Sequence, residues 1–311
     1  MSVQIPTSSS KVTKQVQYYA ETNGYGAQVV NPTFVNAGII SNASMSITVD
    51  HEEIRIQGSR KQYADIQMGV EGVITLDYRF LDTKLLRYGI TDPNGVGTIE
   101  ESLAFVFARK IDNVEMFCLA RGCVSEQATI TFDRVPMVSQ QFYSSSISEW
   151  LTLAQLKTAL GVNSTASVTF AGAITAEPWT HLTGSSNGVS TSVTVNSAAT
   201  DITKMTVTVN NNLLKEKPLG YKTVKFVEAG NKVVTVSIEP YLYDNSFFLL
   251  VNNYTSIDIS GVLKASTPTV TLQVLGAKLN SYDDKSDASG GDFITTPTNG
   301  TAVDCTVTAY P

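Results

Sequence analysis

Few residues of this chain have the types and spacing that catalysis or metal binding requires. The two histidines, His51 and His181, lie 130 positions apart, and neither sits in a nucleophile elbow or an HExxH pattern. The cysteines form no CxxC pair and are odd in number, which argues against a disulfide framework or a zinc ribbon; they are Cys118, Cys123 and Cys305. We therefore expect no enzymatic activity, no metal site and no cofactor, and we expect the cysteines to be small buried side chains.

Two further patterns resemble binding motifs only in part. The acidic residues between Asp283 and Asp292 surround two glycines, but they lack the spacing and the closing glutamate of an EF-hand, so a solvated loop is favoured over a weak calcium site. Gly24-Tyr-Gly26 and Asn94-Gly-Val-Gly97 are incomplete phosphate-binding glycine loops. We expect both to form turns.

Two polar loops combine charge with aliphatic side chains, a composition that suits docking between proteins. The residues of the first loop that we expect at such an interface are Asp50, His51, Glu52, Glu53, Arg55, Arg60 and Lys61. Those of the second are Asn211, Asn212, Leu213, Leu214, Lys215, Glu216 and Lys217. Solvated hairpin tips are the alternative interpretation of both loops.

The composition limits the class of protein. The chain has 311 residues, of which 42% are apolar and only 16% charged, and it contains 30 Ser and 36 Thr, a balance that favours strands over helices. Its net charge of -6 argues against a protein that grips nucleic acid. The polar start and the lack of a long apolar run predict no signal peptide and no membrane span, hence synthesis in a cytoplasm.

Short segments rich in β-branched residues predict a mainly β fold. They are Met45–Val49, Val73–Asp77, Ala128–Phe132, Ser192–Val195, Met205–Val209, Val233–Ser237, Thr269–Gln273 and a last strand at Val303–Val307. Most alternate apolar with polar residues, which predicts one covered face and one wet face lined with hydroxyls. In the first of them, Met45, Ile47 and Val49 are expected on the covered side, opposite Ser46, Thr48 and Asp50.

Two short helices are expected beside the strands. Ser146-Ile-Ser-Glu149 resembles a capping box, and the apolar residues after it end at Gly161, where a left-handed cap belongs. Leu81–Gly89 is a weaker candidate of about two turns.

An internal repeat spans most of the chain. Met45–Val49 aligns with Met205–Val209 at a spacing near 160 residues. Further on, Gly72 aligns with Val233, and two later segments align more loosely: Leu103–Ala108 with Ile257–Gly261, and Met116–Gly122 with Val270–Gly276. A repeat of this size is a duplicated domain, because solenoid units are shorter. We predict β domains at 1–145 and 190–311, joined by a helix and a Ser/Thr/Gly-rich connector or insertion at 146–189.

Two stretches resemble the tail tube proteins of tailed phages and related viruses. The first is the run from Pro32 to Val49, its charged loop, Gly72–Leu76 and Leu81–Tyr88. The second is Val193–Asn196 followed by Ile202–Leu214 and Leu219-Gly220. The resemblance covers about two thirds of the chain and rests on the order of patterns.

The resemblance implies a β-sandwich or barrel domain with a flanking helix, whose sheets join those of neighbours into a closed ring. Rings stack into a hollow tube, and the two polar loops match the loop that reaches the adjacent ring. Two domains in one chain then imply a trimer in place of the family's hexamer. The expected partners are further copies of the chain, other tail proteins (tape measure, distal tail and tail terminator) and passing double-stranded DNA, but no membrane.

The acidic balance has a use in such a tube. A channel without clustered Lys and Arg avoids the counterion release that makes DNA bind. The residues expected to face this lumen are Ser46, Thr48, Asp65, Asp77, Thr206 and Thr208. The chain is then a structural protein of the virion tail, assembled in the host cytoplasm.

Two other classes remain open. A two-domain adhesin or surface-fibre protein would also be rich in strands, Ser and Thr, but it predicts export and independent domains. A β-sandwich hydrolase would require carboxylates that converge in one cleft, and no spacing in the sequence demands such a cleft.

Overall fold

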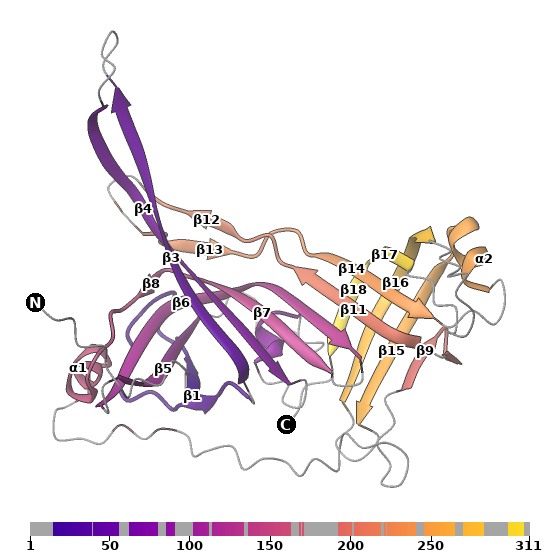
Figure 1. Ribbon diagram of the computed structural model, residues 1–311, viewed down its shortest axis with the longest axis horizontal. Helices are drawn as coiled ribbons and strands as arrows, with labels where there is room; N and C mark the ends of the chain where they lie inside the picture. The colour runs from indigo at the N-terminus through magenta and orange to yellow at the C-terminus, as the bar shows by residue number, and fades with distance from the viewer. Residues whose placement is uncertain are drawn as a thin grey trace, which may run out of the picture.

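The computed structural model confirms the expected mainly β fold class (Figure 1). It describes residues 15–38, 40–55, 62–79, 85–90, 102–111, 114–133, 136–162, 168, 170, 192–200, 202–218, 221, 223–240, 246–264, 270–282 and 298–307. Every segment predicted as a strand lies in one over its described residues, apart from Val303 at the start of the last segment; Thr269 lies outside the described residues. Much of the connector at 146–189 and the acidic segment after Tyr282 lie outside the described residues.

In its described residues, the N-terminal half contains eight strands, one 3-10 helix and one α-helix. The strands are β1 (Gln15–Ala20), β2 (Val35–Asn36), β3 (Ile40–Arg55), β4 (Gln62–Arg79), β5 (Leu103–Ile111), β6 (Val114–Phe132), β7 (Met137–Ser144) and β8 (Ser146–Ile147). The 3-10 helix η1 (Leu86–Tyr88) follows β4, and helix α1 (Leu153–Ala159) follows β8.

The C-terminal half contains the remaining elements. Its strands are β9 (Ser192–Val195), β10 (Ala198–Thr200), β11 (Ile202–Asn210), β12 (Leu214–Glu216), β13 (Phe226–Glu228), β14 (Val233–Pro240), β15 (Ser256–Lys264), β16 (Val270–Tyr282), β17 (Thr298–Ala302) and β18 (Asp304–Val307). Helix α2 (Ser246–Asn252) follows β14.

Both halves pair their strands in the same order. In the N-terminal half the antiparallel order is β3-β4-β7-β6-β5-β1-β2, with β8 also on β6. In the C-terminal half it is β11-β14-β17-β16-β15-β9-β10, with β18 also on β16. The short helices match too, because η1 packs on β6 and α2 packs on β16. The two halves are therefore topological copies, as the sequence repeat indicates.

The strand register makes the correspondence specific to single residues. Counting from the pairings, β5 and β6 match β15 and β16 in the alignment predicted from sequence, so that Gly122 corresponds to Gly276. The alignment of β4 with β14 differs. Gly72 pairs with Ile47, and Val236 pairs with Val207, so Gly72 corresponds to Val236 and not to Val233.

One sheet joins the two halves. Strand β11 pairs with β14 of its own half and, on its other edge, with β6 of the N-terminal half, from Met205 opposite Phe132 to Asn210 opposite Gln127. The result is a continuous 16-stranded sheet, beside which β12 and β13 form a separate two-stranded sheet. The predicted domain boundaries near 145 and 190 stay a prediction, since the halves share this sheet.

A left-handed glycine lies at the same place in the long strand of each half. Gly122 in β6 has φ 60° and Gly276 in β16 has φ 61°, a conformation that glycine adopts without strain. A Cβ atom on Gly122 would lie 2.2 Å from Oγ of Ser145. Each glycine N–H donates to a carboxylate, from Gly122 to Glu21 at 3.2 Å and from Gly276 to Asp258 at 2.8 Å.

The helices differ from the prediction in position and length. The Ser146 segment is not a capping box, because Ser146 and Ile147 pair with β6 as strand β8. The capping box lies six residues later, where Thr152 Oγ1 accepts from the N–H of Gln155. Gly161 does adopt the left-handed conformation, with φ 65°. Of the segment from Leu81 to Gly89, only the single turn of η1 is helical in its described part.

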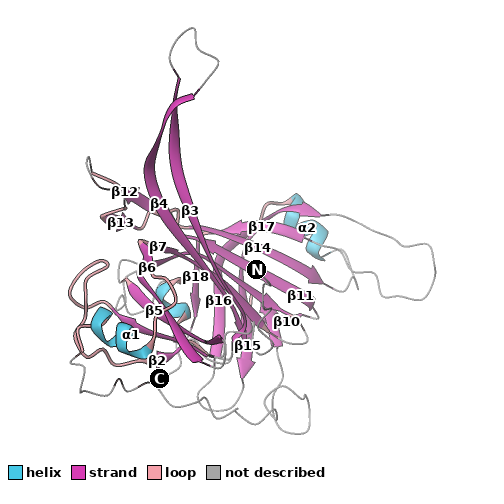
Figure 2. Cartoon of the chain, turned by 60° about the vertical axis from the view of Figure 1, so that its left-hand side comes forward, coloured by secondary structure: helices cyan, strands magenta, loops and turns pink. Residues whose placement is uncertain are grey.

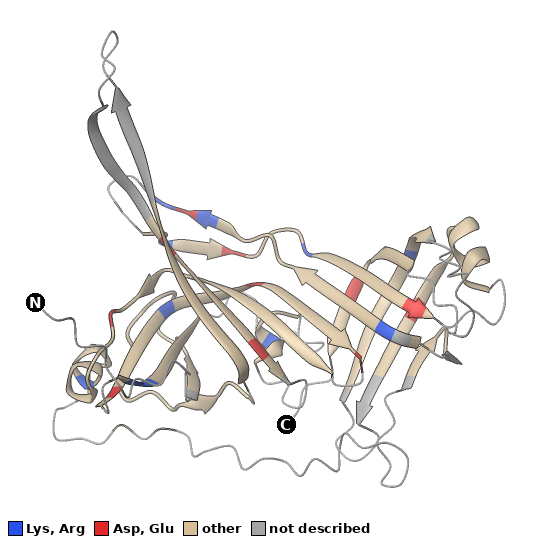
Figure 3. Ribbon diagram, viewed as in Figure 1, with Lys and Arg blue, Asp and Glu red and all other residues tan. Residues whose placement is uncertain are grey.

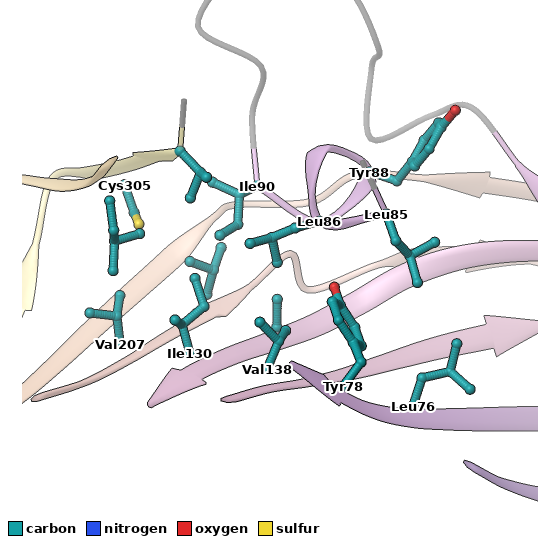
Figure 4. Close-up of a cluster of buried hydrophobic side chains, with 14 of the residues drawn as sticks. Leu76, Tyr78, Leu85, Leu86, Tyr88, Ile90, Ile130, Val138, Val207 and Cys305 are labelled. Carbon is teal, nitrogen blue, oxygen red and sulfur yellow. The ribbon is translucent and has the colours of Figure 1, made fainter. Parts of the chain in front are cut away.

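The main hydrophobic core lies on one face of the shared sheet and takes side chains from both halves. Figure 4 shows Ile130 and Val138 of the N-terminal half beside Val207 and Cys305 of the C-terminal half, and all four side chains are fully buried. Leu86 of η1 belongs to the same cluster. Burial on this scale accounts for the alternation in the strands, because only every second residue can face the core.

Candidate self-assembly surfaces

The described residues offer no arrangement for metal binding. Among them, no group of three or more His, Cys, Asp or Glu side chains gathers at one point. The three cysteines are free and buried. Burial raises the pKa of the Cys118 and Cys123 thiols and raises that of Cys305 to about 12, so each thiol stays protonated at neutral pH. Only the backbone of His51 is described, and His181 lies outside the described residues.

One face of the shared sheet is polar across four strands of each half. Following the register across β3, β4, β7, β6, β11, β14, β17 and β16, alternate residues fall on the face opposite the core. The hydroxyl and amide residues of this face include Asn42, Ser44, Ser46, Thr48, Thr75, Ser139, Gln141, Gln127, Thr129, Thr131, Thr206, Thr208, Asn210, Ser237, Thr235, Asn299, Thr301 and Ser281. We call it the polar face.

The residues predicted to face a lumen lie together on this surface. Ser46 and Thr48 of β3, Asp77 of β4, and Thr206 and Thr208 of β11 all belong to the polar face by register. The side chain of the sixth, Asp65, is not among those described.

Hydrogen bonds link neighbouring strands of the polar face. The carboxylate of Asp77 accepts from Ser139 Oγ at 2.6 Å and from the Asn42 amide at 3.0 Å. Thr129 Oγ1 and Thr208 Oγ1 lie 3.1 Å apart across the junction of the two halves. These bonds hold the polar side chains of neighbouring strands in place.

Charge is sparse and mixed on the polar face. The charged residues there with described side chains are Glu71, Asp77, Lys204, Glu239 and Lys278. Figure 3 shows most of the sheet without charged residues. Such a face presents no cluster of Lys and Arg to a polyanion.

The second predicted interface loop lies against the N-terminal half of its own chain. Lys215 of β12 forms an ion pair with Glu126 at 3.1 Å, and its Nζ lies 4.3 Å from the ring centroid of Tyr143. Leu213 packs on the cluster that contains Tyr143 and Val124. Leu214 is 57% exposed, and Glu216 pairs with Phe226 in the β12–β13 sheet.

The prediction that Asn211 belongs to an exposed interface loop is wrong. Its side chain is 0% exposed, and its amide donates to the carbonyl oxygens of Gly89 at 3.1 Å and Ser125 at 3.0 Å. It therefore fastens the C-terminal half to the N-terminal half and is not a surface residue. Asn212 is exposed, with φ 42°, and its amide donates to the carbonyl of Asn231. Lys217, the last residue of the set, is also exposed.

The first predicted interface loop is the far part of a long β arm. The backbones of Asp50, His51, Glu52, Glu53 and Arg55 lie in β3 and pair with β4, whereas Arg60 and Lys61 lie outside the described residues. Figures 1 and 2 both show the β3–β4 arm projecting away from the body of the chain, while the shorter β12–β13 pair stays closer to it. The equivalent segments of the two halves thus have different surroundings.

The apolar face of β3 also differs from that of its equivalent. Ile47 and Val49 are 53% and 48% exposed, although the sequence predicts them on a covered side. Their equivalents in β11, Val207 and Val209, are both 0% exposed. The cause is position in the sheet: β11 lies between β14 and β6, whereas β3 has only β4 beside it in the described pairings.

Comparison with known proteins gives no identity to these surfaces. No model of a protein family matches the chain, and no curated protein is significantly similar to it. Within the described part, the helices are also too short to cross a membrane.

Proposed function

We propose that the chain is a structural virion protein, the subunit of a tail tube through which double-stranded DNA passes. The observation that carries this proposal is the polar face, which extends across four strands of each half and has the core behind it. It is interrupted at Val73, Val124 and Tyr143, the last two of which are buried in a cluster with Val227 of β13. A wall of this kind needs one wet surface and one buried surface over many strands. Its hydroxyls and amides do not attract phosphate as clustered Lys and Arg would.

The size of the polar face supports a trimeric ring. Three copies, each with eight strands on this face, would place about 24 strands around a closed barrel. Barrels of about 16 to 18 strands already leave an aqueous channel, so a ring of this size has room for a duplex. Closure would also remove free sheet edges, which otherwise invite uncontrolled pairing.

The partners and location follow from this proposal. The chain binds further copies of itself in stacked rings, contacts other tail proteins at the tube ends and along the lumen, and carries out no catalysis. The residues of the β3–β4 arm and the exposed part of the β12–β13 segment are the candidates for contacts between rings. The protein belongs to the tail of a virion and assembles in the host cytoplasm.

Negative-stain electron microscopy of the purified full chain over a concentration series tests the proposal. We expect hollow rings and then tubes as the concentration rises, with a channel wide enough for a DNA duplex. A chain that stays monomeric at the highest concentration would refute the proposal and would favour a two-domain adhesin or surface-fibre protein.

A second measurement tests which face lines the channel. We expect tubes of the double variant Thr206→Lys/Thr208→Lys to retain double-stranded DNA at low salt, because the variant adds a ring of positive charge to the polar face. The matched control is Asn253→Lys, at an exposed turn after α2. Equal DNA retention by the two kinds of tube would show that the polar face does not line the channel.

A further inference from the structure

In its described residues, the chain forms one strand junction between its halves and also contains the two strands of an equivalent junction, which do not pair with each other. In the occupied junction, β11 pairs along β6, with Val209 opposite Ala128 and Asn210 opposite Gln127. By the shared topology, β3 is the equivalent of β11, and β16 is the equivalent of β6. Within one chain β3 and β16 do not pair with each other in the described residues.

The equivalence of β6 and β16 is defined by their irregularities. Pairing of β6 with β7 skips Glu126, between Ser125 and Gln127. Pairing of β16 with β17 skips Asn280 in the same way, immediately before Ser281. Because both bulges fall at the same step after the left-handed glycine, Gln127 corresponds to Ser281, and the next residue, Ala128, corresponds to Tyr282.

The edge of β16 at this point has the same surroundings as the edge that β6 offers to β11. On β6, pairing with β5 ends at Cys123, and β11 takes over the same edge from Gln127. On β16, pairing with β15 ends at Lys278, and β17 alone is the described neighbour of Ser281 and Tyr282. Backbone donors and acceptors at such an edge form a template for another strand.

Exposed apolar side chains lie on the elements that would cover this second junction. Around the occupied junction, Leu86 of η1 shares a core cluster with Val207 (Figure 4). Helix α2, the equivalent of η1, carries Phe248 and Leu249, which are 48% and 50% exposed. The exposed Ile47 of β3 is the matching apolar surface, since its equivalent is Val207.

We propose that β3 of one copy pairs antiparallel with the end of β16 of the next copy, with Asp50 opposite Ser281 and Val49 opposite Tyr282. The occupant of each edge that lacks a partner among the described residues is therefore a second copy of this chain, joined head to tail. The closure of three copies into a ring rests on the proposed function. The pairing of β3 with β16 and its register follow from the duplicated topology. Because the junction between copies repeats the junction within a copy, each half in the ring has the same neighbours.

Disulfide trapping in the full chain tests the register. The variants Asp50→Cys and Ser281→Cys are prepared separately, mixed and oxidised, so that any cross-link between them joins two copies. We expect a covalent dimer on non-reducing gels from the mixture, and trimers or closed species from the double variant. The three native cysteines are buried, and oxidation of the unmodified chain measures the background cross-linking that they cause.

A displaced pair provides the control for register. Thr48→Cys lies two residues from Asp50 on the same face of β3, so its cross-link with Ser281→Cys should form at least about fivefold less, given the greater distance between diagonal residues. Equal or stronger trapping of the displaced pair would overturn the proposed register.

A charge on the apolar face tests whether β3 is an assembly edge. We expect Ile47→Asp to abolish assembly in sedimentation and microscopy while the melting temperature of the monomer changes by less than about 2 °C, because Ile47 is 53% exposed. The matched variant Val207→Asp, at the buried equivalent, should unfold the chain. Normal assembly of Ile47→Asp would overturn the proposed junction.

The outcomes separate this inference from the proposed function. Cross-linked open chains without hollow rings would support the junction and refute the tube. Hollow tubes without the Asp50–Ser281 cross-link would support the tube and refute the junction. Absence of both assemblies and cross-links would refute both.

Discussion

Asn211 is the residue whose replacement most directly tests how the two halves are joined. It follows β11 at the point where the C-terminal half meets the N-terminal half, and it is 0% exposed. Its side-chain amide donates to Gly89 O at 3.1 Å and to Ser125 O at 3.0 Å. Its backbone N–H donates to Glu126 O at 2.8 Å, and this bond does not depend on the side chain.

The expected cost of Asn211→Ala follows from the two side-chain bonds. The substitution leaves two buried carbonyl oxygens without these donors, and an unsatisfied buried group costs about 1 to 3 kcal/mol. We therefore expect the free energy of unfolding to fall by about 2 to 5 kcal/mol, a large share of the total stability of an ordinary domain. Asn211→Asp should cost more, because it places carboxylate oxygens against the two carbonyls.

Urea unfolding followed by circular dichroism measures this effect, at a protein concentration where the chain is monomeric. The control is Asn253→Ala, at an exposed turn, which should change the free energy of unfolding by less than about 0.5 kcal/mol. If Asn211→Ala loses less than about 1 kcal/mol, or if Asn211→Asp is as stable as the wild type, Asn211 does not fasten the halves as described.

Three further substitutions test the surroundings of the polar face. Gly122→Ala should destabilise the chain by about 2 to 4 kcal/mol in urea unfolding, since it adds a Cβ clash to a left-handed backbone; Gly24→Ala, at φ 111° with open space around it, should cost less, and the reverse order would contradict this account. Burial raises the pKa of the Glu21 carboxyl, so its protonation favours the folded chain. Thermal melting should therefore show the wild type gaining stability relative to Glu21→Gln as the pH falls from neutral towards 5, and a constant difference would argue against this burial effect. Lys215→Met should cost about 1 kcal/mol through loss of the Glu126 ion pair, with a smaller loss at high salt; a loss independent of salt would assign the effect to packing.

Much of the strand architecture can be predicted from the sequence because alternation is a local property. Met45–Val49 and Met205–Val209 both alternate apolar with hydroxyl residues, and both are strands with the hydroxyls on one face. The looser alignment of Met116–Gly122 with Val270–Gly276 is confirmed by the register, since the two glycines share a left-handed conformation that few other residues adopt.

Some of the candidate surfaces were missed because their cause is not local. Thr129, Ser139 and Gln141 extend the polar face, and alternation in β6 and β7 was the available signal. The burial of Asn211 has no such signal, because its partners Gly89 and Ser125 come from the other half of the chain.

The sequence by itself determined the strands, their two faces and the duplication of one β unit. The tertiary structure decided what each copy of that unit contacts. Ile47 and Val207 occupy the same place in nearly the same local pattern, yet one is 53% exposed and the other 0%. The physical reason is that a strand's burial depends on its neighbours in the sheet: β11 has a strand on each edge, and β3 has a described strand on only one.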